Sequence, residues 1–550
     1  MGKKQKNKKK APQSKENHSP SPAKKPAAAE KPSSTAKSSA KKSSAGHLPT
    51  VFLSAISLIC GCLVMVIELT SSRVLAPYYG NTIYCWTGVI GTVLFAMSLG
   101  YLLGGFLAEK HPRQKLLYTL LIISGATAST IPFTASALAN FLTNYDSYTT
   151  GPIVGSLLIF CLPAFCLSTI PPLCVKIISD NVKMVGVASG IVSSTSAIGS
   201  ILGTFLTGFY LIPNFALSQI YYFTAVIPFV LCLVAYFLDK TSLNQKAIKT
   251  AALLIVSFSL WGVQGQVDVF PVVNGKKEIY KNLNSYHLVR VYDEKNYYLL
   301  TLDSTNEGAL TKKEGNLIFR YTKYWELIKC FRSQEELKSA CFVGGGAFAM
   351  PMIFHKNFPQ CNIDAVEIDP ELKEVGKRFF KLQESEKFHI NIDDGRRWFR
   401  GKSNVYDFIF LDAFHGVRSI PHHLVTSEYF KELHTALTND GVIAINVIAA
   451  REGKQSQLYK SLVKTIKQHF ANIVVFAVNR EMKKARTNLI FFVFKKSPNM
   501  VQARRKADKL LLGSMYYKKA AVIDDEYVAK FADHPILTDE YAPVEYMVAE

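Results

Sequence analysis

The sequence predicts a multi-pass α-helical membrane domain followed by an α/β domain that contains a parallel sheet. Residues 50–265 are almost entirely apolar, whereas residues 270–550 alternate short apolar runs with amphipathic stretches of helical length. Apolar helices of about 20 residues cross the hydrocarbon core of a bilayer, and strands that alternate with helices form parallel sheets. At 550 residues, the chain is also too long for one ordinary domain.

Residues 1–48 form a basic tail before the first apolar run. They hold thirteen lysines and two glutamates in a chain whose formal net charge is +22, and they contain no aromatic residue. Such a segment cannot bury enough apolar surface to offset its chain entropy, so we expect it to be disordered. A basic tail can touch anionic lipid or nucleic acid. We favour a cytosolic tail that fixes the membrane topology and binds no specific nucleic acid.

Six segments are long and apolar enough to span a membrane, and residues 250–264 form a shorter seventh. The six are 50–71, 84–108, 116–141, 152–174, 185–212 and 217–238. Lysine and arginine concentrate in the tail and in the loops at 109–115, 175–184 and 239–249, which should therefore face the cytosol. The lipid bilayer is the expected partner, and the cell membrane the expected location. Six or seven spans would place the α/β domain on opposite sides, and both stay open.

Glycines recur at helix-packing spacing in the apolar block, as Gly100 with Gly104, Gly186 with Gly190, and Gly199 with Gly203. Such pairs let helix backbones approach closely. We interpret them as packing within the chain, and a homodimer interface is the alternative.

The chain holds ten cysteines, and none forms a CxxC pair. None has a histidine at zinc-finger spacing either. We expect reduced, buried cysteines, so the sequence predicts neither a disulfide framework nor a metal site.

Four successive strand-like runs in the α/β region end in residues with chemical uses. These ends are the glycines Gly344, Gly345 and Gly346, then Glu367, Asp394 and Asp412. Ligands of such sheets bind beyond the carboxyl ends of the strands, so the four ends should meet at one crevice. Alone, a glycine run is a turn and a strand-end aspartate is usually a helix cap. Together and in order, the four ends predict nucleoside binding.

Each end would have its own part in that binding. Glycines let the backbone approach a ligand without a Cβ clash. Glu367 can accept hydrogen bonds from both ribose hydroxyls, and Asp394 can accept a hydrogen bond from the exocyclic amine of adenine. Asp412 lies where the reactive end of the ligand should be, and a carboxylate there can stabilise a cation, orient an amine or take its proton.

At these residues the chain resembles a known family. VGGG, AVEIDP, DDGRRWF and YDFIFLDAF resemble the spermidine synthase (polyamine aminopropyltransferase) family, and MVIELTSSRVLAPYYG resembles its membrane-fused members. The resemblance implies a Rossmann-like, S-adenosylmethionine methyltransferase-type domain with a small N-terminal β-hairpin domain. The expected parts are then 1–48 (tail), 49–265 (spans), 266–335 (small β-rich part) and 336–550 (Rossmann-like domain).

The resemblance also implies an activity, that of an EC 2.5.1-like transferase. Such an enzyme moves an aminopropyl group from decarboxylated S-adenosylmethionine to a polyamine such as putrescine, without a metal. By position, Glu367 would bind ribose and Asp394 with Gly395 would bind adenine. Asp412 would serve the attacking amine. Tyr324 falls at the tyrosine of the family, and His287 falls where soluble members commonly carry glutamine.

Three departures affect the amine end of the expected site. Ala347 and His415 stand where soluble members carry aspartates, and Trp325 replaces a polar residue. His415, His422 or His423 could supply a different base. The departures keep two alternatives open: a methyltransferase that uses S-adenosylmethionine, and a non-catalytic nucleoside- or polyamine-sensing domain coupled to a membrane transporter.

Overall fold

A computed structural model of the chain describes most residues from Leu48 onward. The described residues are 48–111, 113–145, 147, 149–182, 184–238, 253, 256–257, 268–271, 276–413, 420–516 and 520–549. The expected disordered tail, apart from Leu48, and most of the expected seventh segment at 250–264 lie outside these residues.

The N-terminal part of the described chain is helical. Its helices are α1 (Thr50–Tyr79), α2 (Ile83–Lys110), α3 (Arg113–Asn144), α4 (Gly151–Ile159), α5 (Cys161–Ser168), α6 (Ile170–Val182), α7 (Val185–Leu206), η1 (Thr207–Leu211), α8 (Ile212–Asn214) and α9 (Leu217–Leu238). Six stretches among the described residues are long and apolar enough to cross a membrane: Thr50–Tyr79, Ile83–Lys110, Arg113–Asn144, Cys161–Ser179, Val185–Asn214 and Leu217–Leu238. This confirms the six expected apolar segments.

The fourth expected span, 152–174, is broken rather than continuous. Helix α4 ends before Phe160, and α5 ends before Thr169. Proline has no N–H to donate to the preceding turn, and Pro163, Pro171 and Pro172 lie just beyond the two breaks. The spanning stretch accordingly begins at Cys161 and ends at Ser179.

Two of the three glycine pairs lie at helix contacts. A Cβ on Gly100 or Gly104 would collide with the backbone of α5 and the residue after it, at Phe165 and Thr169. A Cβ on Gly199 or Gly203 of α7 would likewise collide with the backbone of α1, at Leu58 and Cys62. Among the described residues, no atom from outside the adjacent turns of α7 lies within 4 Å of a Cβ placed on Gly186 or Gly190. The first two pairs therefore serve packing within the chain.

The β-rich part begins with a four-stranded antiparallel sheet in the order β1-β2-β3-β4. Its strands are β1 (Glu278–Leu283), β2 (Leu288–Asp293), β3 (Tyr297–Leu302) and β4 (Thr305–Thr311). A 3-10 helix, η2 (Tyr321–Leu327), and a short helix, α11 (Ile328–Phe331), lead into the second sheet.

The second sheet has eight strands in the order β12-β10-β11-β9-β8-β5-β6-β7. They are β5 (Ser339–Val343), β6 (Asn362–Glu367), β7 (Phe388–Ile392), β8 (Tyr406–Leu411), β9 (Leu437–Ala449), β10 (Asn472–Ala477), β11 (Thr487–Phe494) and β12 (Ala520–Ile523). The five strands from β9 to β7 run parallel, as the sequence predicts. The other three strands, β11, β10 and β12, each pair antiparallel with their neighbours. The whole sheet is therefore mixed.

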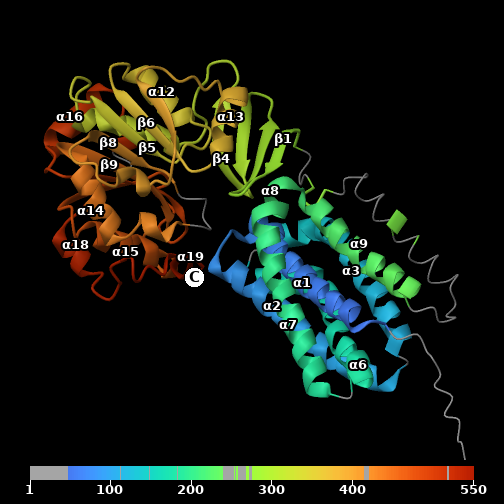
Figure 1. The fold of residues 1–550 in the computed structure, drawn as a ribbon. Helices are drawn as coiled ribbons and strands as arrows, with labels where there is room; N and C mark the ends of the chain where they lie inside the picture. Colours follow the sequence, from blue (N-terminus) through green and yellow to red (C-terminus); the bar gives the residue numbers. More distant parts are fainter. Residues whose placement is uncertain are drawn as a thin grey trace, which may run out of the picture. The chain divides into compact units, whose positions relative to one another are not determined.

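Helices cover both faces of this sheet, as Figure 1 shows for α12 on one side and α14 and α15 on the other. They are α12 (Ala349–Asn357), α13 (Pro370–Phe379), η3 (Arg397–Phe399), η4 (His422–Leu424), α14 (Ser427–Ala436), η5 (Lys454–Ser456), α15 (Gln457–Ile466), α16 (Met500–Lys509), α17 (Gly513–Tyr516), α18 (Asp525–Ala529) and α19 (Val544–Ala549). Alternate strand residues face opposite sides: Phe342 packs in one core, Cys341 and Val343 in the other. The order of the parallel strands reverses at β5, since β6 and β7 follow on one side of it and β8 and β9 on the other. A ligand crevice is expected at such a point.

Candidate functional site

The glycine run after β5 makes a tight turn beside the end of β8. Gly344 has a φ of +93° and Gly346 a φ of +49°, a region that favours glycine. A Cβ on Gly344 would collide with the backbone oxygen of Asp412. The amide of Asp412 donates a hydrogen bond to the Val343 oxygen at 2.8 Å. The glycines therefore allow the ends of β5 and β8 to lie against each other.

Glu367 ends β6 and is held by the backbone. Its side chain accepts hydrogen bonds from the amide of Gly345 at 2.6 Å and from the amide of Asp369 at 3.0 Å. Burial raises the pKa of Glu367, and the two amides oppose that effect. Asp369 caps α13 by accepting the Glu371 amide at 2.9 Å. The Glu367 carboxylate is thus a fixed acceptor beside the glycine turn.

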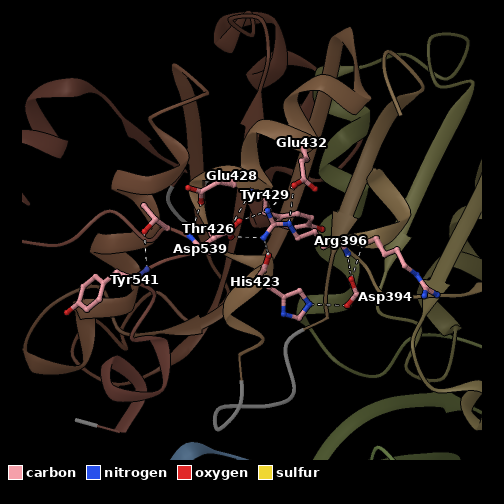
Figure 2. Close-up of polar contacts among 11 residues, drawn as sticks. Asp394, Arg396, His423, Thr426, Glu428, Tyr429, Glu432, Asp539 and Tyr541 are labelled. Atoms are coloured by element: carbon pink, nitrogen blue, oxygen red, sulfur yellow. Dashed lines mark hydrogen bonds and ion pairs between the residues drawn. The ribbon is translucent and has the colours of Figure 1, made fainter. Parts of the chain in front are cut away.

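Asp394 follows β7 and combines a capping role with a contact to a histidine. Its Oδ1 atom accepts the backbone amides of Arg396 and Arg397, each at 2.9 Å. Its Oδ2 atom lies 3.0 Å from Nε2 of His423, whose ring points toward it in Figure 2. Burial acts to raise the pKa of Asp394, but the Arg397 amide and His423 outweigh it and lower the pKa. A carboxylate oxygen accepts two hydrogen bonds, so Oδ2 retains capacity for a ligand.

Asp412 follows β8 and lies half-buried in a polar cluster. Its Oδ1 atom accepts a hydrogen bond from Nδ2 of Asn446 on β9 at 2.7 Å, and Asn446 accepts one from Asn488 on β11 at 3.0 Å. The hydroxyl of Tyr321 also bonds this carboxylate. Burial, with a smaller contribution from the negative charge of Glu307, raises the pKa of Asp412 to about 8, although the bonds from Asn446 and Tyr321 oppose it.

Two cavities meet at this carboxylate. The larger encloses about 1010 Å³ and the second about 700 Å³, and Glu307, Tyr321 and Asp412 line both. The larger cavity is lined by all the predicted strand-end residues, namely Gly344, Gly345, Gly346, Glu367, Asp394, Gly395 and Asp412, and by His287. The four strand ends therefore share one crevice, as the sequence predicts.

The larger cavity is strongly acidic. Its carboxylates are Glu307, Glu367, Asp393, Asp394 and Asp412, and none of its described lining residues is a lysine or arginine. His287 lies at its edge with Nδ1 3.3 Å from Oδ2 of Asp303. Carboxylates without a cation attract a positively charged ligand. Among the described residues, no group of three or more His, Cys, Asp or Glu side chains is arranged to hold a metal ion.

Of the other two predicted catalytic residues, one lies away from Asp412 and one is outside the described residues. Tyr324 is 4% exposed, packs in the hydrophobic core and lines neither cavity; Tyr321, three residues earlier, contacts Asp412 instead. His415 lies outside the described residues. Sequence reasoning also missed Glu307 and Asn446, and it considered His423 only as an alternative base and not as a partner of Asp394. Asn446 carries a recognisable signal, because it is a single amide within the apolar run GVIAINVI.

Two family models match the chain. Residues 325–504 match the spermine/spermidine synthase domain, and residues 79–350 match the Major Facilitator Superfamily. A polyamine aminopropyltransferase of Vibrio vulnificus is 29% identical over 171 residues, covering 30% of this chain and 54% of that protein. The mouse eEF1A lysine and N-terminal methyltransferase is 27% identical over 149 residues, covering 26% and 21%.

A second curated relative and a solved structure cover about half of the chain. A Bifidobacterium longum protein, named a probable polyamine aminopropyl transferase, is 26% identical over 296 residues, covering 49% of this chain and 61% of that protein. The crystal structure of a probable spermidine synthase from Corynebacterium glutamicum has 20% identity and a TM-score of 0.41, covering 49% of this chain and 97% of that one. The chain thus spans 54% and 61% of the two aminopropyltransferases. The chain is therefore similar to the spermine/spermidine synthase domain over residues 325–504, and to the Major Facilitator Superfamily over a region that includes most of the apolar helical block.

Proposed function

We propose that the chain is a membrane-bound transferase that moves an aminopropyl group from decarboxylated S-adenosylmethionine to an amine. The observation that carries the proposal is the position of Asp412. It lies half-buried where two cavities meet, with Tyr321 and Asn446 bonded to its carboxylate. A donor in one cavity and an acceptor in the other would react at this carboxylate, and such positioning is a large part of enzymatic rate enhancement.

The larger cavity suits the donor. Glu367 would accept hydrogen bonds from the ribose hydroxyls. Oδ2 of Asp394, next to Gly395, would accept a hydrogen bond from the adenine amine. The donor carries a sulfonium and a terminal ammonium, and the acidic lining of the cavity suits both cations. His287 would lie at the ribose end, because it lines the larger cavity together with Glu367.

The chemistry is a single displacement. The amine nitrogen attacks the methylene carbon bound to the sulfonium, so that a C–N bond forms while the C–S bond breaks. The bonding electrons stay on sulfur, and neutral methylthioadenosine leaves. Asp412 takes the proton of the attacking amine. A general base works best when its pKa lies near the working pH, and the pKa of Asp412 is about 8.

Glu307 would replace the carboxylate that is absent at position 347. Ala347 is 2% exposed and packs against Gly308, the neighbour of Glu307 on β4. Glu307 lines the same cavity and its charge acts on Asp412. We propose that Glu307 binds the terminal ammonium of the donor. Methylthioadenosine lacks that ammonium. The variant Glu307→Gln should therefore bind decarboxylated S-adenosylmethionine about 10- to 100-fold more weakly and methylthioadenosine unchanged.

A methyltransferase is the second candidate, and the absent carboxylate at Ala347 favours it. S-adenosylmethionine carries a carboxylate that the acidic larger cavity would repel. Calorimetric titration of the purified full chain with the two nucleosides separates the candidates, together with an assay of methylthioadenosine release in the presence of amines. Tighter binding of S-adenosylmethionine would overturn the aminopropyl proposal. Nucleoside binding without turnover on any amine would favour a sensor coupled to the helical block.

The helical block would anchor the enzyme in the cell membrane with its basic tail in the cytosol. The supporting observation is the concentration of lysine and arginine in the tail and in alternate loops. Six spans would return the chain to the cytosol, where the nucleoside is made. Protease digestion of sealed cells and of inverted vesicles tests this topology, because tail and synthase domain should be cleaved only in the vesicles.

A further inference from the structure

The second cavity lies on the side of Asp412 away from the glycine turn. It encloses about 700 Å³. Its lining is formed by Asn306, Glu307, Phe319, Arg320, Tyr321, Asp412, Asn446, Ile448, Val478 and Asn488. It shares only Glu307, Tyr321 and Asp412 with the larger cavity. A molecule bound here presents one end to the Asp412 carboxylate and the other to the rest of this lining.

The charges of this lining are divided between the end shared with the larger cavity and the part that is not shared. Both carboxylates, Glu307 and Asp412, lie at the junction with the larger cavity, whereas the single cation of the described lining, Arg320, belongs to the second cavity alone. Arg320 is exposed, and no ion pair of its side chain is found among the described residues. A diamine would therefore meet an arginine at its far ammonium instead of a carboxylate.

The wall between these ends is polar but neutral. Asn488 donates to Asn446, and Asn446 donates to Asp412, so the two amides are fixed in orientation across three neighbouring strands. Ile448 and Val478 add apolar surface beside them. Such a wall suits a short methylene chain and supplies no charge to hold a second ammonium.

We infer that the second cavity binds an amino acid whose amine lies at Asp412 and whose carboxylate lies at Arg320, rather than a diamine. Guanidinium groups pair with carboxylates through two parallel hydrogen bonds. An ω-amino acid is the simplest molecule of this class. The inference rests on the proposed aminopropyl transfer, because it names the acceptor of that reaction.

Acceptors of matched length test the inference on the purified full chain. Methylthioadenosine release would be measured with decarboxylated S-adenosylmethionine and either putrescine or 5-aminopentanoate, which share a four-methylene spacer. We expect kcat/KM to be at least about 10-fold higher for the amino acid, as for a charge-assisted hydrogen bond. The variant Arg320→Glu should reverse the preference. Lys323→Gln is the control, because Lys323 is an exposed lysine that lines neither cavity and lies on the 3-10 helix beginning directly after Arg320.

A binding measurement separates this inference from the proposed function. Calorimetry with 5-aminopentanoate, on protein saturated with methylthioadenosine, should show binding that Arg320→Glu abolishes and Lys323→Gln retains. Binding of 5-aminopentanoate without turnover would overturn the proposed aminopropyl transfer but support the acceptor site. Turnover with putrescine that exceeds turnover with 5-aminopentanoate, and that Arg320→Glu leaves unchanged, would keep the transfer and overturn the acceptor class.

Discussion

The nucleoside end and the reactive end of the larger cavity hold their carboxylates in different ways. At the nucleoside end, Glu367 and Asp394 each accept two backbone amides. At the reactive end, Asp412 is bonded by the side chains of Asn446 and Tyr321. Backbone amides belong to the fold and keep a carboxylate in place as an acceptor. A carboxylate held by neutral side chains in a partly buried site can change its protonation state, as a base must.

The largest expected effect comes from removing the base at the reactive end. The variant Asp412→Asn keeps the shape of the side chain but cannot take a proton, so methylthioadenosine release should fall by about 10²- to 10⁴-fold. Calorimetric affinity for methylthioadenosine should stay nearly unchanged, because the nucleoside end is intact. Loss of nucleoside binding would mean that the two ends are not separate.

Asp407 provides the matched control at the opposite end of the same strand. It is 8% exposed and accepts the Lys338 amide and the Thr438 hydroxyl, each at 2.9 Å. The variant Asp407→Asn should lower the thermal stability but keep the rate per folded molecule. An equal loss of rate in both aspartate variants would show that Asp412 serves the fold rather than the chemistry.

The second effect tests the nucleoside end. In Glu367→Gln, the amide NH₂ group must face the backbone N–H of Gly345 or of Asp369, because each carboxylate oxygen of Glu367 now accepts one of them. Affinity for methylthioadenosine should fall by about 10- to 100-fold, as when a hydrogen bond to a charged group is lost. The turnover at saturating donor should fall much less than in Asp412→Asn. If Glu367→Gln lost turnover but kept its affinity for methylthioadenosine, the division of the cavity into a nucleoside end and a reactive end would be wrong.

The third effect is a pH dependence that belongs to the reactive end alone. Below its pKa of about 8, Asp412 is protonated and cannot take a proton from the acceptor. The kcat/KM profile should therefore rise with pH through about 8. A bound sulfonium favours the ionised carboxylate, so the kcat profile should rise at a lower pH. The hydrogen bond from Asn446 lowers this pKa, and Asn446→Leu should move the rise to higher pH.

Comparison of this variant with the wild-type protein at the same acceptor cancels the ionisation of the acceptor itself. Folding favours the protonated form of Asp412, because its pKa is higher in the folded protein than in the unfolded chain. This contribution to stability is therefore present at acid pH and is lost as the pH rises through about 8. Asp412→Asn should remove that loss. An unchanged pH profile in Asn446→Leu would exclude Asp412 as the titrating group.

The sequence predicted the four strand ends because the carboxyl ends of parallel strands meet at one edge of a sheet, whatever their exact packing. It did not predict which tyrosine contacts Asp412. Tyr321 and Tyr324 are one turn apart on a 3-10 helix, so their side chains project from the same face of that helix. Only the packing of the helix brings Tyr321, rather than Tyr324, to the cavity. Asn446 stands out in the sequence as a single amide in an apolar run, but its contact with Asp412 could not be predicted because that contact depends on the register of β9 against β8.

The smallest expected effect concerns the way the C-terminal segment supports the nucleoside end. Arg396, two residues after Asp394, donates to both oxygens of Asp539, at 2.6 and 2.8 Å, and to Glu432 at 2.9 Å. Figure 2 shows this group together with Thr426, which donates to Asp539 at 2.8 Å. Because Asp539 is 42% exposed, solvent screens the pair, and its coupling should be at most about 1 kcal/mol.

A double-mutant cycle of Arg396→Lys and Asp539→Asn, followed by thermal unfolding of the full chain, measures that coupling. Lysine cannot reproduce the two parallel bonds of the guanidinium, so the single variants should lose similar stability and the double variant little more. Affinity for methylthioadenosine should fall only slightly, because the Arg396 backbone amide still reaches Asp394. A drop as large as in Glu367→Gln would mean that the C-terminal segment, and not the backbone of the loop after β7, fixes the adenine end.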